Sequence, residues 1–200
     1  MDGVLFDTVE LMQQSTLMRY PDLSADTLRN LNKGNFFEEI EKLAHLKKEE
    51  TEEEKIYRRE KYTKDKLNAP MYAGIKELLY GISKKYVLAV NTSASMGNSL
   101  PLFEKEEITS LFSFLGTKDV HASKVEKFKI IGEKFDQKPE DMLFITDTIG
   151  DIREAEIAGI PTIAVTWGIH NREYFEKETF KVMIAIIDTP EHLEEYIQDF

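Results

Sequence analysis

The sequence contains no cysteine, a single tryptophan and six prolines among its 200 residues. The lack of cysteine excludes disulfide bonds and thiolate metal sites. Apolar runs are short, and none approaches the ~18 residues that a membrane-spanning helix requires. Basic residues are in the minority, because 26 Lys and Arg face 37 Asp and Glu and leave a formal net charge of −11. A chain this acidic is a poor binder of phosphate backbones, so we expect no nucleic-acid partner.

The length and composition are typical of a folded protein of one or two domains. Hydrophobic residues make up 42% of the chain, which argues against disorder. At ~150 residues per domain, the length allows a sizeable core. No basic segment followed by an apolar one opens the sequence, so we expect a cytoplasmic protein with no membrane attachment. A monomer and a homodimer are both compatible with these features.

The first third of the chain has a helical pattern. Apolar residues recur at helical spacing between residues 9 and 67. Ser24 is placed to cap one helix, and Thr51 with Glu54 forms a capping box at the start of another. Residues 68–70 (NAP) then end the helical block. The pattern predicts a set of helices that precedes a different kind of structure.

After residue 70 short apolar runs alternate with helical patterns, which is typical of a parallel sheet covered by helices on both faces. We therefore predict an α/β fold, a doubly wound parallel sheet of Rossmann type, with an inserted helical cap. The predicted core comprises residues 1–13 and 69–200, and the predicted cap residues 14–68. The predicted strands are 86–90, 112–115, 142–145, 162–165 and 183–187, and the helices among them include 124–135 and 152–158.

Polar side chains collect where the predicted strands end. In an open parallel sheet the carboxyl ends of the strands lie along one edge, and binding sites form there. Hydroxyl groups, an ammonium group and carboxylates follow these strands, and we expect them to converge. Such a set suits a phosphate with a divalent cation, because Mg²⁺ prefers a few carboxylates, waters and a substrate phosphate. The residues concerned are Asp2, Thr92, Ser93, Lys124, Asp147 and Asp151.

Four motifs in this order resemble those of the haloacid dehalogenase superfamily, in its phosphatase-type branch with a helical cap. Residues 2–8 (DGVLFDT) are similar to the second half of the first motif, and Thr92 stands in the place of the second. Lys124 matches the third motif, a lysine at the start of a helix. Residues 146–161 (TDTIGDIREAEIAGIP) match the fourth, an acidic pair after a strand. The resemblance spans nearly the whole chain, whereas the cap matches only in length and helical character.

The resemblance implies phosphoryl transfer, in the simplest case hydrolysis of a small phosphomonoester through an aspartyl-phosphate. Asp2 would act as general acid and base, and Lys124 and Thr92 would hold the phosphoryl oxygens, with Ser93 as the alternative hydroxyl. The partner would be a small phosphorylated metabolite. Lys33 lies where capped relatives place a substrate-specificity loop, and it is a candidate substrate contact.

The resemblance also implies a Mg²⁺ cofactor and its ligands. These would be the main-chain carbonyl of Asp2 and the carboxylate of Asp147, with Asp151 as a further ligand or as a neighbour that orients one. Arg19 and Arg29 are further cap cations that could meet an anionic substrate. The histidines show no ligand spacing, and we interpret them as surface or packing residues: His45, His121, His170 and His192.

The first motif departs from the family pattern at its start. In the family the nucleophilic Asp stands two positions before the acid/base residue, and the sequence begins one residue before Asp2. We therefore expect the sequence to be an N-terminally shortened form of a working enzyme and the chain as given to be inactive. Two alternatives stay open, a catalytically inactive binding or regulatory protein and a sugar-phosphate mutase with the same site. Haloacid dehalogenase chemistry is disfavoured, because it needs neither Mg²⁺ nor an acid/base such as Asp2.

Overall fold

Parallel strands form the centre of the core in the computed structural model, which describes residues 1–198. They pair as two sheets, one of two strands in the order β1-β2 and one of three in the order β3-β4-β5. Every pairing is parallel, as the alternation of strands and helices predicts. The strands are β1 (Leu88–Asn91), β2 (Phe112–Gly116), β3 (Phe144–Thr146), β4 (Thr162–Val165) and β5 (Met183–Ile187).

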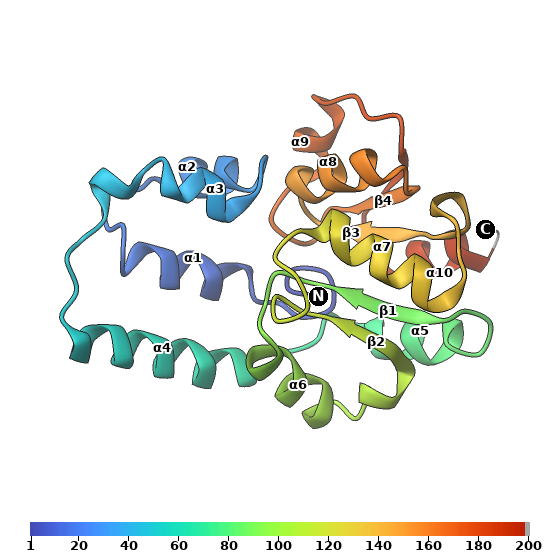
Figure 1. The fold of residues 1–200 in the computed structure, drawn as a ribbon, viewed down its shortest axis with the longest axis horizontal. Coiled ribbons are helices and arrows are strands. Elements are labelled where there is room, and N and C mark those ends of the chain that lie inside the picture. Colours follow the sequence, from blue (N-terminus) through green and yellow to red (C-terminus); the bar gives the residue numbers. More distant parts are fainter. Residues whose placement is uncertain (199–200) are drawn as a thin grey trace.

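The first residues of the chain lie between the two sheets (Figure 1). They form a turn closed by their own main-chain bonds, in which the amide of Gly3 donates to the carbonyl of Phe6 and the amide of Leu5 donates to that of Met1. Phe6 is fully buried in the main hydrophobic cluster, together with residues of both sheets such as Val90 and Ile163. The expected single sheet is therefore divided into two, because the turn pairs with itself and with residues 70–72 and not with β1 or β3.

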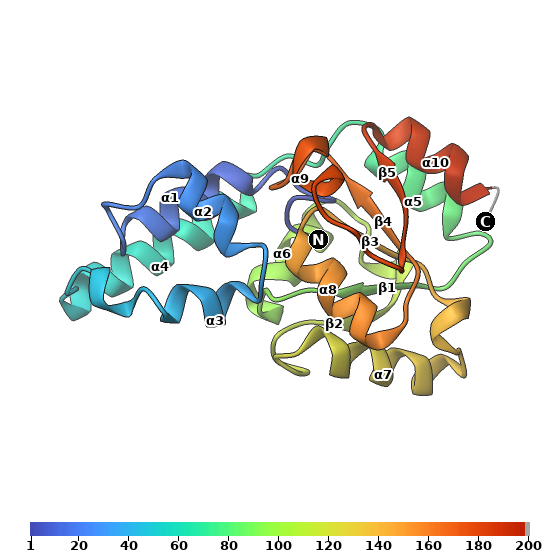
Figure 2. The same cartoon turned by 90° about the horizontal axis from the view of Figure 1, so that it is seen from above.

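Helices cover both faces of the strands (Figures 1 and 2). Helices α7 (Lys124–Phe135) and α8 (Ile149–Ala158) pack together on one face, and α5 (Ile75–Ile82) and α10 (Pro190–Gln198) on the other. The predicted doubly wound α/β architecture is thus confirmed. The remaining core helices are α6 (Met96–Lys105) and α9 (Arg172–Glu176), with short 3₁₀ turns at Thr109–Leu111 and Pro139–Asp141.

Four helices form the block that projects from the core (Figure 1). Ser24 caps α2 and Thr51 forms the predicted capping box of α4 with Glu54. A small apolar cluster that contains Tyr20, Leu28 and Ile40 holds the block together. The division of the chain at residue 14 stays a prediction, and α1 extends across that position. The helices are α1 (Val9–Leu17), α2 (Ala25–Leu31), α3 (Phe36–Glu41) and α4 (Glu52–Leu67), with a 3₁₀ turn at Ala44–Leu46.

The loop between α2 and α3 docks onto the start of α8. The amide of Gly150 donates a 2.9 Å hydrogen bond to the carbonyl of Asn32. A Cβ atom at Gly150 would lie 2.2 Å from the carbonyl oxygen of Gly34 and 3.0 Å from that of Asn32. The 2.2 Å contact is closer than a side chain allows, so the docked position of the cap loop depends on glycine at this point.

We expect Gly150→Ala to push the docking loop away from α8. The added methyl group should lower the free energy of unfolding by about 1–3 kcal/mol, the usual cost of overpacking. The amides of residues 29–35 should exchange faster in hydrogen-exchange measurements. Gly97→Ala is the matched control, because nothing lies within 4 Å of a Cβ there. Equal behaviour of the two variants would show that the loop does not depend on this close approach.

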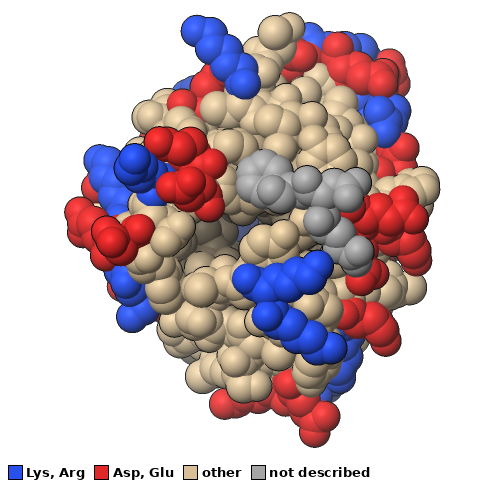
Figure 3. Space-filling model, turned by 90° about the vertical axis from the view of Figure 1, so that its right-hand side faces the viewer, with Lys and Arg blue, Asp and Glu red and all other residues tan. Residues whose placement is uncertain are grey.

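The face of the core opposite the cap carries acidic side chains in several groups, with basic side chains scattered among them (Figure 3). This distribution agrees with the net charge of −11. Among residues 1–198 no helix is long and apolar enough to cross a membrane.

Candidate active site

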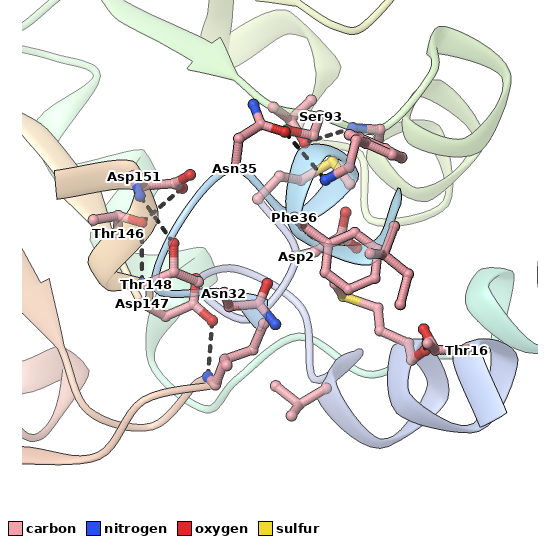
Figure 4. Close-up of a pocket in the computed structure, with 18 of the residues that line it drawn as sticks. Asp2, Thr16, Asn32, Asn35, Phe36, Ser93, Thr146, Asp147, Thr148 and Asp151 are labelled. Atoms are coloured by element: carbon pink, nitrogen blue, oxygen red, sulfur yellow. Dashed lines mark hydrogen bonds between the residues drawn. The ribbon is translucent and has the colours of Figure 1, made fainter. Parts of the chain in front are cut away.

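All the predicted site residues except Lys33 converge on one cavity of about 310 Å³ between the core and the cap (Figure 4). Thr92 and Ser93 follow β1, Asp147 follows β3, and Lys124 begins α7. The carboxyl ends of the strands therefore lie on the side where the cap docks. The predicted residues that line the cavity are Asp2, Thr92, Ser93, Lys124, Asp147 and Asp151.

Lys124 brings a positive charge to the wall of this cavity. Its side chain is almost fully buried, and Nζ donates a 3.1 Å hydrogen bond to Oγ of Ser93. Nζ also lies 3.5 Å from a carboxylate oxygen of Asp151. The main-chain amide of Lys124 donates to the carboxylate of Glu154, which fixes the start of α7. An ammonium group in this position can neutralise charge on an anion that enters the cavity.

Thr92 and Ser93 place two hydroxyl groups beside Lys124. Thr92 is buried, and its Oγ1 accepts a hydrogen bond from the amide of Ala94. The carbonyl of Thr92 accepts from Nζ of Lys127, a fully buried lysine whose pKa is lowered to about 8, first by burial and then by Lys124. Lys127 thus fixes the loop that carries both hydroxyl groups, although the sequence assigned it no role. Which hydroxyl would contact a phosphate stays open.

Asp147 is a buried carboxylate in close contact with the first turn of the chain. It is 3% exposed, and its Oδ2 accepts a 2.9 Å hydrogen bond from the amide of Ile169. Burial raises its pKa to about 6, because desolvation of the charged form outweighs the stabilising hydrogen bond from Ile169 and the charge of the N-terminus. A Cβ atom at Gly3 would lie 2.0 Å from Oδ2, and Gly3 has a φ of +68°, so only glycine fits there.

Asp151 lies in the first turn of α8, four residues after Asp147. One oxygen accepts a 2.8 Å hydrogen bond from Thr146, and the other faces Lys124. Residues 1–198 contain no cluster of three or more His, Cys, Asp and Glu side chains that could hold a metal ion. The expected Mg²⁺ ligands include only two carboxylates, those of Asp147 and Asp151, with the carbonyl of Asp2. The donors that are present are oxygen atoms, which suit Mg²⁺, and a cation would stabilise the buried charge of Asp147.

Asp2 faces the cavity from the first turn and is bound by the cap. Nζ of Lys66 lies 2.8 Å from one of its oxygens and 2.9 Å from the other. The hydroxyl of Thr8 donates a further hydrogen bond of 3.0 Å to Asp2. Lys66 stands near the end of α4 and is only 2% exposed, so this ion pair is shielded from water. The sequence did not indicate Lys66, since nothing distinguishes it from the other lysines of that helix.

His170 connects the site to the cap. Its Nδ1 accepts a hydrogen bond from the amide of Ile149, so the ring is neutral with its proton on Nε2, which lies 3.0 Å from the carbonyl of Arg29. Burial lowers the pKa of His170 to about 4, because a charged ring would lose the bond from Ile149 and its contact with water. The interpretation of His170 as a packing residue is too narrow, because it also joins α8 to the cap.

We expect His170 to make stability depend on pH. Between pH 4 and 6.5 the unfolded histidine binds a proton that the folded one does not, so its contribution is complete above pH 6.5 and is lost as pH falls to 4. The difference in unfolding free energy between wild type and His170→Gln should therefore rise with pH by up to about 3 kcal/mol. Denaturant titrations of both proteins measure it, and the subtraction removes the opposite effect of Asp147. A difference that is flat across this range would contradict the assignment.

The three cationic side chains of the cap that the sequence offers as possible substrate contacts differ in their position relative to the cavity. Lys33 does not line the cavity, because its Nζ lies over the ring of Tyr174 and 3.7 Å from the carboxylate of Glu178 on the core. Arg29 forms an exposed ion pair with Asp26. Arg19 does line the cavity. Of these three cations, only Arg19 is therefore placed to meet a molecule inside it.

Sequence comparisons match most of the chain to one family. The family described as "haloacid dehalogenase-like hydrolase" matches residues 1–165. Phosphoglycolate phosphatase of Salmonella typhimurium (strain LT2) is 34% identical over 76 residues, which are 36% of this chain and 30% of that protein. The enzyme of the same name from Escherichia coli (strain K12) is 33% identical over the same length. The chain thus matches about a third of the length of these relatives.

Solved structures are similar over almost the whole chain. A haloacid dehalogenase-like hydrolase from Streptococcus pneumoniae has a TM-score of 0.77 at 19% identity and covers 99% of this chain and 95% of its own. CbbY from Rhodobacter sphaeroides, solved in complex with phosphate, has a TM-score of 0.74 at 20% identity. The match covers 96% of this chain and 92% of CbbY. At this level of identity the likeness establishes the fold.

Proposed function

Because this chain belongs to the haloacid dehalogenase-like hydrolase family, we propose that its site transfers the phosphoryl group of a small phosphomonoester to water with the help of Mg²⁺. One observation carries the proposal: a buried ammonium group, two hydroxyl groups and a buried carboxylate meet in a single cavity. Lys124 is the centre of this set. A phosphoryl group beside it would have its charge offset in a site from which water is largely excluded.

The proposed reaction has two steps. A carboxylate nucleophile, which residues 1–200 do not supply at the position two before Asp2, attacks phosphorus, and the bond from phosphorus to the leaving oxygen breaks while Asp2 donates a proton to that oxygen. Asp2 then removes a proton from water, which attacks the aspartyl-phosphate and releases inorganic phosphate. Lys124 and a hydroxyl of Thr92 or Ser93 hold the non-reacting oxygens in both steps. The substrate family is suggested by the phosphoglycolate phosphatases, whose name describes such an ester.

Mg²⁺, when bound, would supply positive charge to the phosphoryl oxygens and the attacking carboxylate. Asp147, the carbonyl of Asp2 and Asp151 are the proposed ligands. Asp151 already accepts a hydrogen bond from Thr146, which would fix its orientation toward the ion. Asp2 reacts only after its carboxylate separates from Lys66 and Thr8, so the proposal includes a rotation of this side chain.

Mg²⁺ binding tests the proposed metal site directly. We expect calorimetry to detect weak binding to the wild-type chain and none to Asp147→Asn, because Mg²⁺ releases its waters reluctantly and needs the charged ligand. Asp141→Asn is the matched control, since Asp141 is exposed and outside the cavity. If Asp147→Asn bound the ion as well as the control does, the assignment would be wrong.

A further inference from the structure

The cavity extends from the phosphate site into the cap along one face of α1. Val9, Met12, Gln13 and Thr16 line it, and Arg19 and Tyr20 continue the same face beyond the end of the helix. At about 1.5 Å of rise per residue, Arg19 stands roughly 16 Å beyond Thr8, whose hydroxyl is bonded to Asp2. The far end of the cavity is therefore well separated from the catalytic carboxylates.

The walls between the two ends carry no charged side chain and combine apolar residues with neutral polar ones such as Thr16, Asn32 and Asn35. Phe36 of the cap faces the same space as Asp2, Asp147 and Ser93 of the core (Figure 4). Leu28 and Ile40, which belong to the small cluster inside the cap, also line it. A bound molecule would meet charged groups at the core end and only uncharged side chains along its middle.

Positive charge exceeds negative charge at the far end. Arg58 lines the cavity there and binds both carboxylate oxygens of Glu50, with N–O distances of 2.6 and 3.1 Å. The guanidinium groups of Arg58 and, more weakly, Arg19 both lower the pKa of Glu50. One carboxylate thus balances two guanidinium groups. Its oxygens are already used by Arg58.

The guanidinium group of Arg19 lies over the ring of Tyr20, 5.5 Å from the ring centroid, but its Nε lacks a hydrogen-bond acceptor. This nitrogen is buried, and within residues 1–198 no carboxylate lies within ion-pair distance of the guanidinium group. The main chain at this point is fixed, because the amide of Lys48 donates to the carbonyl of Arg19. A buried donor without a partner is costly, and an anionic acceptor at this position would satisfy both the hydrogen bond and the excess charge.

We infer that the substrate is an elongated phosphomonoester with an uncharged middle and a second anionic group, carboxylate or phosphate, that Arg19 binds at the far end. This inference rests on the proposed function, because it takes the phosphoryl group to lie at Lys124. Phosphoglycolate itself does not fit it, since its carboxylate stands next to the phosphate and cannot reach both cations. Arg19 acts as a specificity residue, and it takes no part in the reaction at phosphorus.

Binding of phosphonates to the 200-residue chain tests this inference without requiring turnover. The probes are a long alkylphosphonate, the same compound with a terminal carboxylate or phosphonate, and phosphonoacetate as a short counterpart. We expect the distal charge of the long probes to tighten binding about tenfold or more, the effect of a charge-assisted hydrogen bond. This gain should disappear in Arg19→Met and return in part in Arg19→Lys. Arg59→Met, exposed on α4, should keep it.

The alkylphosphonate separates this inference from the proposed function. It lacks the distal charge, so Arg19→Met should bind it as wild type does, which also shows that the variant is folded. Lys124→Met should lose binding of the alkylphosphonate. If wild type bound the alkylphosphonate but gained nothing from the distal charge, or if the gain survived in Arg19→Met, the Arg19 site would be overturned while the phosphate site stood. Tighter binding of phosphonoacetate than of the long probes with a distal charge would also overturn the Arg19 site. If no probe bound, both the Arg19 site and the phosphate site would be contradicted.

Discussion

A chain extended by an apolar strand that ends in Asp immediately before Met1 is expected to hydrolyse a chromogenic phosphomonoester with Mg²⁺, whereas the 200-residue chain is not. Residues 1–200 place no carboxylate two positions before Asp2, and Asp7 lies past the turn. Misplacing a reacting group by about 1 Å can cost roughly 10²-fold in rate, so Asp7 cannot substitute. Loss of a nucleophile costs roughly 10³-fold or more, which sets the expected difference.

The same extension ending in Asn is the matched control, because it adds the strand without the reactive carboxylate. Phosphate release by the three proteins, with and without Mg²⁺, is the measurement. Activity of the Asn form equal to that of the Asp form would exclude an aspartyl-phosphate at this position. Comparable Mg²⁺-dependent activity in the unextended chain would show that the roles of Asp2 and its neighbours are misassigned. If all three were inactive, a binding or regulatory role would be favoured.

Lys66→Met is expected to lower the free energy of unfolding by about 3 kcal/mol, because removing one partner of a buried ion pair leaves an uncompensated charge. Lys66 is 2% exposed and its partner Asp2 15%, so water replaces little of the lost interaction. The pair also joins the end of α4 to the first turn of the core, so its loss should loosen the cap. Denaturant unfolding at neutral pH measures the change.

Lys61→Met is the matched control for this substitution. Lys61 stands on the same helix and pairs with Asp65, but both side chains are more than a third exposed. Exposed pairs of this kind contribute about 0.2–1 kcal/mol, so the control should lose little. A loss in Lys66→Met no larger than in Lys61→Met would show that the ion pair with Asp2 adds nothing to stability.

The sequence predicts several regular elements of the core well, because the helices have a helical period and the strands are short apolar runs. Helix α7 (Lys124–Phe135) and strands β4 (Thr162–Val165) and β5 (Met183–Ile187) have the predicted bounds. Strand β1 begins at Leu88 and not at residue 86, because Tyr86 and Val87 are exposed and lie outside the pairing. The division into two sheets could not be predicted, since it depends on main-chain bonds within the turn at residues 1–6.

The residues of the candidate site that directly follow strands could be predicted. Those that are placed by contacts between distant parts of the sequence could not. Thr92 and Asp147 were found because parallel strands bring their ends to one edge. The role of Lys66 could not be predicted, because its partner Asp2 lies 64 residues away in the sequence and the cap contains many similar lysines. The cap loop was expected to present Lys33 to a substrate, but that side chain pairs with Glu178 on the core, and Arg19 lines the cavity instead.

That Lys124 and its neighbours hold a phosphoryl group is tested most directly by titrating the 200-residue chain with inorganic phosphate in the presence of Mg²⁺, followed by ³¹P NMR. Saturable binding is predicted for wild type and for Lys129→Met, whose lysine is exposed on the same helix and pairs with Glu126. Lys124→Met should bind at least about tenfold more weakly, as expected for loss of a charge-assisted hydrogen bond. Equal binding by Lys124→Met and Lys129→Met would contradict the assignment of this cavity as a phosphoryl-transfer site.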